Sequence, residues 1–176
     1  TTTYHMFNPA LITRAGYSDF RMNRSYALEH TIYFGSEQHL SKAITVNYGA
    51  RLTAFRNMGK TLQYHYDNNY DVSGATEYGS GKIYHTYIRP EFRAGLVYKL
   101  DDWSSVKANF THNTQFIQIA NNSDSGSPLD LWFPASPNIK PQEANQYSVG
   151  YFRNFKENTI ETSVEFYYKG MKNVID

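Results

Sequence analysis

Two long polar segments of this 176-residue chain carry aromatic rings beside amide and carboxylate groups. Aromatic faces stack on sugars or peptides while the neighbouring polar groups supply hydrogen bonds, so this combination suits a binding surface for either ligand. The alternative is that the segments pack on themselves, with Trp132 and Phe133 anchoring Pro134 and Pro137. The candidate ligand-contacting residues are Tyr64, Tyr66, Asp67, Tyr70, Asp130 and Trp132.

No catalytic or metal-binding pattern accompanies these rings. The six histidines show no HExxH spacing, and neither a GxSxG elbow nor a GxxxxGK[ST] loop occurs. The run Asp67–Asp71 superficially resembles a calcium loop, but Val72 stands where that loop needs glycine. The chain has no cysteine and a formal net charge of +1, which points to no thiolate site and no nucleic-acid partner. We therefore expect a protein that is not an enzyme and needs no cofactor or metal.

A two-residue alternation predicts the elements that position these segments. In Ala43–Ala54 every even position is apolar and most odd positions are polar or glycine, which gives the two faces of a strand different chemistry. Seven segments with this pattern are rich in Val, Ile, Thr, Tyr and Phe. The predicted strands are Thr1–Phe7, Ser25–Ser36, Lys42–Arg56, His85–Leu100, Ser105–Gln118, Ala144–Asn154 and Thr159–Lys169.

Strand length and loop length together favour a membrane-spanning sheet. Several predicted strands exceed the roughly 5–6 residues typical of soluble proteins, whereas a tilted membrane-spanning strand needs about 9–11. Short connections (Glu37–Ser41, Asp101–Ser104, Phe155–Asn158) alternate with long ones (Asn8–Arg24, Asn57–Tyr84, Ile119–Glu143). In an up-and-down sheet all short turns then lie at one end, as in bacterial outer-membrane barrels. The prediction is an all-β, antiparallel, up-and-down transmembrane β-barrel segment.

The alternation gives the predicted sheet one apolar and one polar face, as in the wall of a barrel. The apolar face, which includes Phe116, would meet lipid, and the polar face would line the lumen. Four glycines on the polar face would make room for a packed plug or allow curvature. Pairing through the Glu37–Ser41 turn would place Ala27 opposite Arg51, with Glu29 diagonal to it. The lumen-facing candidates, for solute contact or for structural pairing, are Glu29, Arg51, Arg89, Glu91, Arg93, Lys107, Glu161 and Glu165.

Two other architectures remain open from these patterns. A soluble carbohydrate-binding β-sandwich explains the alternation equally well, although it explains the strand lengths and loop asymmetry poorly. A passive porin-like barrel explains the alternation, the strand lengths and the loop asymmetry. Seven strands do not close a membrane barrel, and an open edge in lipid leaves backbone groups unpaired at several kcal/mol each. Because Thr1 and Asp176 also lie close to strand ends, we expect a fragment of a longer chain.

The C-terminal half carries a specific resemblance to a known family. Residues 130–158 read DLWFPASPNIKPQEANQYSVGYFRNFKEN, and residues 161–176 read ETSVEFYYKGMKNVID. Upstream, RPEFR at 89–93 and SSVKANF at 104–110 fit the preceding hairpin, and Tyr26–Phe55 fits another less specifically. This sequence resembles the barrel of TonB-dependent outer-membrane receptors of Bacteroidetes type, which often carry an N-terminal carboxypeptidase-regulatory-like domain. The resemblance extends over the whole chain and is strongest from Arg89 onward.

That resemblance implies a function that the residues alone do not. Family members form a 22-stranded barrel around a plug and import scarce, large nutrients (glycan, peptide or metal chelate) with energy from the TonB complex. Residues 1–176 would then be part of the barrel wall, with the plug absent from this chain. The implied partners are outer-membrane lipid and, through the missing plug, the TonB complex, in the bacterial outer membrane. Whether a surface lipoprotein lid covers the loops, as in starch-utilisation-type relatives, stays open.

Overall fold

The computed structural model describes residues 2–5, 25–120, 131–155 and 159–175, all of them in strands and connections. No helix in this part of the chain is long and apolar enough to cross a membrane. The strands are β1 (Thr2–His5), β2 (Tyr26–His39), β3 (Ile44–Met58), β4 (Thr61–Tyr66), β5 (Val72–Tyr78), β6 (Ile83–Lys99), β7 (Ser104–Gln115), β8 (Ile117–Ala120), β9 (Leu131–Pro134), β10 (Gln142–Phe155) and β11 (Ile160–Lys172).

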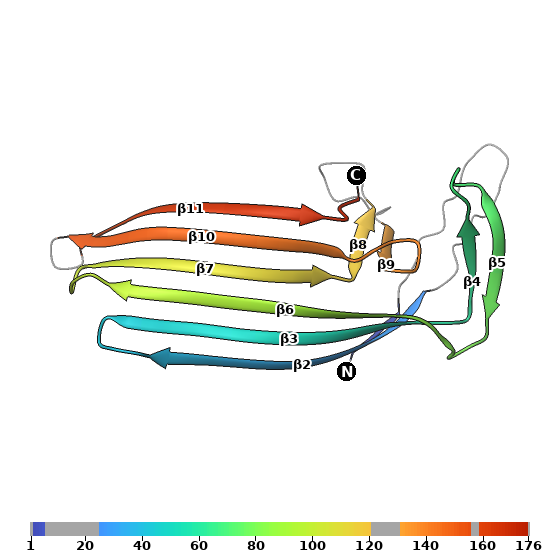
Figure 1. The fold of residues 1–176 in the computed structure, drawn as a ribbon, viewed down its shortest axis with the longest axis horizontal. Coiled ribbons are helices and arrows are strands. Elements are labelled where there is room, and N and C mark those ends of the chain that lie inside the picture. Colours follow the sequence, from blue (N-terminus) through green and yellow to red (C-terminus); the bar gives the residue numbers. More distant parts are fainter. Residues whose placement is uncertain (1, 6–24, 121–130, 156–158, 176) are drawn as a thin grey trace.

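Seven of these strands form one antiparallel sheet in the order β1-β2-β3-β6-β7-β10-β11. Each strand lies beside the next long strand of the chain, so the topology is up-and-down (Figure 1). The short turns lie at one end of the sheet, and the β4–β5 and β8–β9 hairpins lie at the other. The predicted fold class and its seven-strand sheet are confirmed.

Strand pairing between β2 and β3 differs from the sequence-based expectation. Ala27 pairs with Asn57 rather than with Arg51, and Arg51 pairs with Tyr33. The predicted turn was placed too early: β2 continues to His39 and β3 begins at Ile44, so the turn is Leu40–Ala43. Because each strand of a hairpin is counted from its turn, a turn displaced by three residues shifts every cross-strand partner by six. The expected Ala27–Arg51 pair is therefore wrong.

The two described long connections contain strands that the sequence analysis assigned to loops. Strands β4 and β5 pair as a hairpin that extends beyond β3 and β6, and β8 pairs with β9 beside the end of β7. These strands are only four to seven residues long, which is too short for a clear alternation in the sequence. Of the candidate ligand residues, Tyr64, Tyr66 and Trp132 lie on these strands, and Asp67 and Tyr70 lie in the turn between β4 and β5.

One face of the large sheet is apolar and uncovered in the described part of the chain. Ile32 is 71% exposed and Phe166 is 69% exposed, and large apolar side chains are also exposed on β3, β6 and β10 between them. A soluble sandwich would bury this face under a second sheet, whereas the two other sheets here are small hairpins at one end. The exposed apolar face is the surface expected of a wall against lipid.

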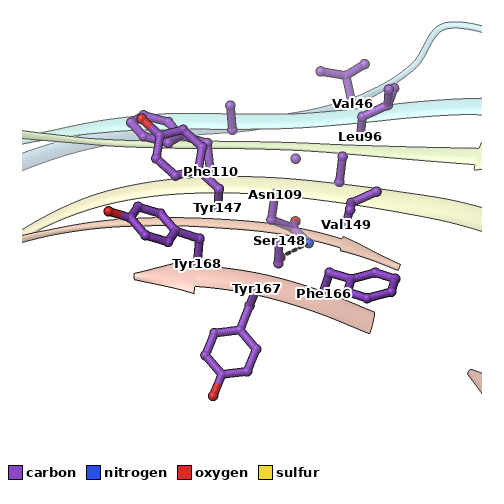
Figure 2. Close-up of a pocket in the computed structure, with 13 residues that line it drawn as sticks. Val46, Leu96, Asn109, Phe110, Tyr147, Ser148, Val149, Phe166, Tyr167 and Tyr168 are labelled. Carbon is purple, nitrogen blue, oxygen red and sulfur yellow. Dashed lines mark hydrogen bonds between the residues drawn. The ribbon is translucent and has the colours of Figure 1, made fainter. Parts of the chain in front are cut away.

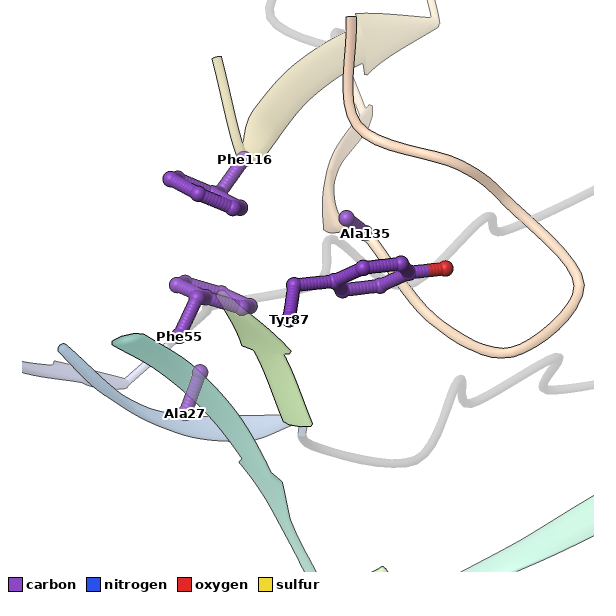
Figure 3. Close-up of a cluster of buried hydrophobic side chains, with 5 residues drawn as sticks. All are labelled: Ala27, Phe55, Tyr87, Phe116 and Ala135. Atoms are coloured by element: carbon purple, nitrogen blue, oxygen red, sulfur yellow. The ribbon is translucent and has the colours of Figure 1, made fainter. Parts of the chain in front are cut away.

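The buried apolar core lies on the opposite, polar face (Figure 3). It consists of Ala27, Phe55, Tyr87, Phe116 and Ala135, near the end of the sheet that carries the hairpins. The rings of Phe55 and Phe116 stack with centroids 4.9 Å apart and an interplanar angle of 6°. Phe116 was expected on the lipid-facing side, and this expectation is wrong. The chain leaves β7 at Gln115, so the strand alternation no longer determines the direction of the next side chain.

The apolar band crosses the sheet diagonally. Along one row of paired residues, Phe34 and Phe92 at one side give way to His112 and Asn145 at the other. From β2 to β11 the centre of the band shifts by about eight residues across five strand steps. With about 3.3 Å per residue and about 4.8 Å between strands, this corresponds to a strand tilt of roughly 45°. Transmembrane barrels tilt their strands by a similar angle.

The short turn between β6 and β7 is closed by an aspartate. Asp101 accepts hydrogen bonds from the Ser104 hydroxyl at 2.7 Å and from the Trp103 backbone N–H at 2.7 Å. These bonds, that from Ser104 foremost, stabilise the ionised carboxylate and lower the pKa of Asp101 below its ordinary value. The turn thus places β7 directly beside β6.

Candidate functional site

The register brings all eight charged candidates to the polar face of the sheet. On this face the residues of β2, β3, β6 and β7 have odd numbers, those of β10 have even numbers, and those of β11 have odd numbers again. Alternating side chains therefore stay on one face across the whole sheet. That this face lines a lumen stays a prediction. The residues are Glu29, Arg51, Arg89, Glu91, Arg93, Lys107, Glu161 and Glu165.

Glu91 connects three neighbouring strands. Its carboxylate accepts two hydrogen bonds from Arg51 of β3, including Nη2 to Oε1 at 2.7 Å, and one from the Thr114 backbone N–H of β7 at 2.9 Å. The side chain is only 4% exposed. A bidentate guanidinium–carboxylate pair with a further backbone donor is among the stronger polar arrangements in proteins.

Glu91 lies where the ladder between β6 and β7 ends. The β6–β7 ladder ends at the pair Phe92–His112, and continuing its register by two residues sets Pro90 opposite Thr114. Proline has no N–H to donate to a ladder. Glu91 binds the Thr114 N–H where the ladder has ended, so its first role is structural.

Two other cations of the polar face also have partners. The Arg89 Nε lies 3.1 Å from Glu143 Oε1. The Lys107 ammonium lies 4.3 Å from the ring centroid of Phe152, within the range of a cation–π contact. These contacts hold charged side chains along the wall and leave them less free to bind a solute.

Side chains of the same sheet occupy the space beside the glycines of the polar face. A Cβ at Gly95 would lie 2.5 Å from Asn47 Oδ1 and 2.7 Å from Asn109 Oδ1, and one at Gly150 would meet Glu165 and Phe152. Gly35 and Gly49 are covered by the side chain of Arg93. That these glycines make room for a packed plug or allow sheet curvature stays a prediction. Each glycine admits a long side chain from a neighbouring position of the same sheet.

The β4–β5 hairpin carries four of the six candidate ligand residues. Tyr64 and Tyr66 are exposed on β4, and Tyr70 is exposed in the turn that follows. Asp67 is used by the turn itself, because its Oδ1 accepts hydrogen bonds from the backbone N–H groups of Asn69 at 2.8 Å and Asp71 at 3.0 Å. The three tyrosines therefore offer exposed rings, whereas Asp67 shapes the loop.

The segment Pro134–Pro141 folds back over the buried core (Figure 3). The Asn57 side chain donates to the Ala135 carbonyl at 2.7 Å, and the Tyr87 hydroxyl donates to the Ser136 carbonyl at 2.7 Å. These contacts hold the segment against β3 and β6, and the alternative that Trp132 and Phe133 anchor Pro134 and Pro137 stays a prediction. Trp132 on β9 is half exposed and remains available at the surface, and Asp130 lies outside the described residues.

The two long connections also contact each other. The Asn138 side chain donates a hydrogen bond to the Tyr64 carbonyl at 3.0 Å. This bond joins the turn after β9 to β4, so the tyrosine-bearing hairpin is held against the Pro134–Pro141 segment. The described candidate ligand residues of the two segments therefore lie at one end of the sheet.

A shallow groove of about 690 Å³ lies over strands β3 to β11 and opens on the apolar face (Figure 2). Its lining on this face includes the short side chains of Ala94 and Ala108 and the larger ones of Leu96, Phe110 and Tyr147. Its lining is almost wholly apolar on this side. Such a surface suits hydrocarbon and offers no site for polar chemistry.

The match to a family model decides the identity of the wall. The model described as TonB dependent receptor-like, beta-barrel matches residues 1–176, the entire chain. The chain belongs to the TonB-dependent receptor β-barrel family. No curated protein and no solved structure matches it.

Membership of this family gives the broad function. TonB-dependent receptors are outer-membrane transporters, not enzymes, and they draw energy from the TonB complex. In the described residues no group of three or more His, Asp or Glu side chains is placed to hold a metal ion. The exposed apolar face and the charged opposite face of this TonB-dependent receptor barrel agree with a wall between lipid and a polar interior.

Proposed function

We propose that residues 1–176 form seven consecutive strands in the barrel wall of an active importer for a large nutrient. The observation that carries this proposal is the family match over the whole chain, together with a long-stranded sheet whose apolar face is uncovered. The plug that closes the lumen and contacts TonB would lie outside these residues. A glycan, a peptide or a metal chelate remains the class of solute.

Solute contact is proposed at the end of the sheet that carries the hairpins. Tyr64, Tyr66 and Tyr70 expose their rings there, and Trp132 lies on the second hairpin. Exposed rings on regular strands lose little conformational freedom when they stack against a ligand. This surface, rather than the charged wall, is the proposed first contact.

The proposal is tested with the receptor that contains this chain. It should fractionate with bacterial outer membranes and migrate differently in denaturing gels before and after heating, because barrel structure persists in detergent. Recovery as a soluble periplasmic protein would sink the proposal. Uptake of the solute should also stop when TonB is deleted, and uptake that continues unchanged would favour the passive porin-like alternative.

The Bacteroidetes-type assignment is the finer part of the proposal. It rests on the sequence motifs of residues 130–158 and 161–176. If the receptor is also of the starch-utilisation type, a surface lipoprotein over the loops would co-purify in mild detergent. Purification of the receptor without any lipoprotein would count against such a lid and would leave both the Bacteroidetes-type assignment and the transport function in place.

A further inference from the structure

The Pro134–Pro141 segment is bound by side chains from four different parts of the described chain. Its first carbonyls accept the hydrogen bonds from β3 and β6 described above. At its other end, Gln118 of β8 donates to the Lys140 carbonyl at 3.1 Å, and Asn173, which follows β11, donates to the Pro141 carbonyl at 2.9 Å. The segment is therefore attached to the sheet at both of its ends.

The middle of this segment is a closed turn. The Ser136 N–H donates to the Ile139 carbonyl at 2.8 Å, and the Ile139 N–H donates to the Ser136 carbonyl at 3.1 Å. Pro134, Ala135 and Pro141 are buried on either side of the turn. Proline fixes its own φ, and a turn bonded in both directions has few other conformations. The segment thus has a single defined shape without any bound ligand.

Asn138 lies within this closed turn and contacts the β4–β5 hairpin. Its side-chain amide donates to the Tyr64 carbonyl at 3.0 Å. Strands β4 and β5 form a two-stranded sheet of their own, separate from the large sheet. An isolated two-stranded hairpin is only marginally stable in water. The bond from Asn138 therefore holds an element that needs support from outside.

This bond determines where the exposed tyrosines of β4 lie. It is made to the backbone of Tyr64, and Tyr66 lies two residues further on the same face of the strand. Fixing the backbone at Tyr64 therefore places both rings. Trp132 lies on β9, whose last residue, Pro134, begins the segment that carries Asn138. One rigid connection thus joins the two hairpins that carry the candidate ligand residues.

We propose that the Pro134–Pro141 segment is a fixed support that positions the β4–β5 hairpin before any solute binds, with Asn138 as the positioning residue. This inference rests on the proposed function, since the hairpin belongs to the proposed solute-contact surface. A surface that is already ordered loses less conformational freedom on binding. The bonds at both ends of the segment favour a fixed support over a lid that closes only around a ligand.

Hydrogen–deuterium exchange of the complete receptor without added solute tests this inference. We expect Asn138→Asp, which replaces the amide donor with an acceptor of nearly the same shape, to speed exchange in β4 and β5 by about fivefold. Asn138→Gln should restore part of the protection, because it keeps the amide donor. Asn69→Asp makes the same chemical change in the turn of the hairpin and should leave the exchange of β4 near that of the parent.

A distance measurement separates position from stability. Nitroxide labels at Glu77→Cys on β5 and Ile88→Cys on β6 report the place of the hairpin relative to the sheet. The distribution of distances between the labels should be narrow in the parent receptor and in Asn69→Asp. It should broaden in Asn138→Asp, while the thermal unfolding of the large sheet stays unchanged.

The remaining outcomes would overturn the inference. Unchanged exchange and an unchanged distance distribution in Asn138→Asp would show that the hairpin is positioned by other contacts, and the proposed transport function would stand. Faster exchange throughout the large sheet would reduce the effect to general destabilisation. A broad distribution in the parent receptor would show a mobile hairpin. Recovery of the receptor outside the outer membrane would instead overturn the proposed function, whatever the exchange of the hairpin.

Discussion

At the scale of single residues, Glu91 shows how a side chain connects strands beyond the end of their backbone ladder. Pro90 lies where the β6–β7 ladder ends, and the Glu91 carboxylate binds the Thr114 N–H beyond that end. The same carboxylate is held by Arg51 of β3, so one side chain connects three strands. The buried position of Glu91 depends on both partners, because an unpaired buried charge is costly.

Removing this carboxylate should weaken the receptor measurably. We expect Glu91→Ala to lower the free energy of unfolding by about 2 kcal/mol, because it leaves the Thr114 N–H unpaired. The loss of the Arg51 ion pair adds less to this change, since the half-exposed guanidinium of Arg51 is then hydrated by solvent. Urea unfolding in detergent measures the change. The control is Glu161→Ala, an exposed acid of the same face, which should stay within about 0.5 kcal/mol of the parent. Equal costs for the two variants would contradict the bridging role.

Asp101 should give the short turn a defined pH dependence. Its pKa is lowered in the folded state by hydrogen bonds from Ser104 and Trp103. The stabilisation is therefore complete above the unfolded value of about 3.9 and is lost as the pH falls through the lower folded pKa. Asp101→Asn should reduce the midpoint of thermal unfolding at pH 7 more than at pH 3.

The neighbouring acid is the control for this turn. Asp102→Asn changes the same charge one residue away and should lower stability less than Asp101→Asn at pH 7. If the two variants had the same pH profile, general charge rather than the Asp101 hydrogen bonds would explain the effect.

At the scale of elements, the β4–β5 hairpin depends on its junction with the sheet. The Gly59 backbone N–H donates to the Lys82 carbonyl at 2.8 Å, and the Gly81 N–H donates to the Gly59 carbonyl at 2.8 Å. A Cβ at Gly59 would lie 2.5 Å from the Gly79 carbonyl oxygen and 2.8 Å from that of Tyr78. These neighbours are backbone atoms, which cannot turn aside as a flexible side chain can.

Substitution at this junction should loosen the hairpin without unfolding the wall. We expect Gly59→Ala to make the hairpin at least about tenfold more sensitive to proteases added outside intact cells, because local opening exposes it. Gly74→Ala is the matched control, since a Cβ there meets nothing within 4 Å. Similar cleavage rates in the two variants would show that the backbone contacts at Gly59 do not limit hairpin stability.

At the scale of the whole molecule, the diagonal apolar band determines how the wall crosses the bilayer. Phe34 in β2 and Asn145 in β10 lie in the same row of paired residues. If strands stood upright, both would lie at one depth. With a tilt of roughly 45° and about 4.8 Å between strands, four strand steps separate them by about 14 Å in depth.

Nitroxide labels on the complete receptor in lipid vesicles measure this difference. A label at Phe34→Cys should be accessible to dissolved oxygen, and one at Asn145→Cys should be more accessible to a water-soluble nickel complex. Ile32→Cys and Val164→Cys, both near the centre of the band, should report similar depths. Equal depths for the Phe34 and Asn145 labels would exclude the tilted arrangement.

The sequence by itself determined the features that depend on local periodicity. Alternation in segments such as Ala43–Ala54 predicted the long strands and their two faces, and the order of short and long connections predicted which end carries the hairpins. The family resemblance of residues 130–158 then pointed to the receptor wall. These properties need only neighbouring residues, since side chains alternate along any strand.

The tertiary structure decided everything that depends on where strands meet. A turn displaced by three residues moved the partner of Ala27 from Arg51 to Asn57, and the turn of the chain after Gln115 moved Phe116 from the lipid face into the core. Likewise, the side chain of Arg93 in β6 covers two glycines, Gly35 and Gly49, only because β2 and β3 align them beside it. Register is a non-local property: it couples residues dozens of positions apart, and no period within one strand encodes it.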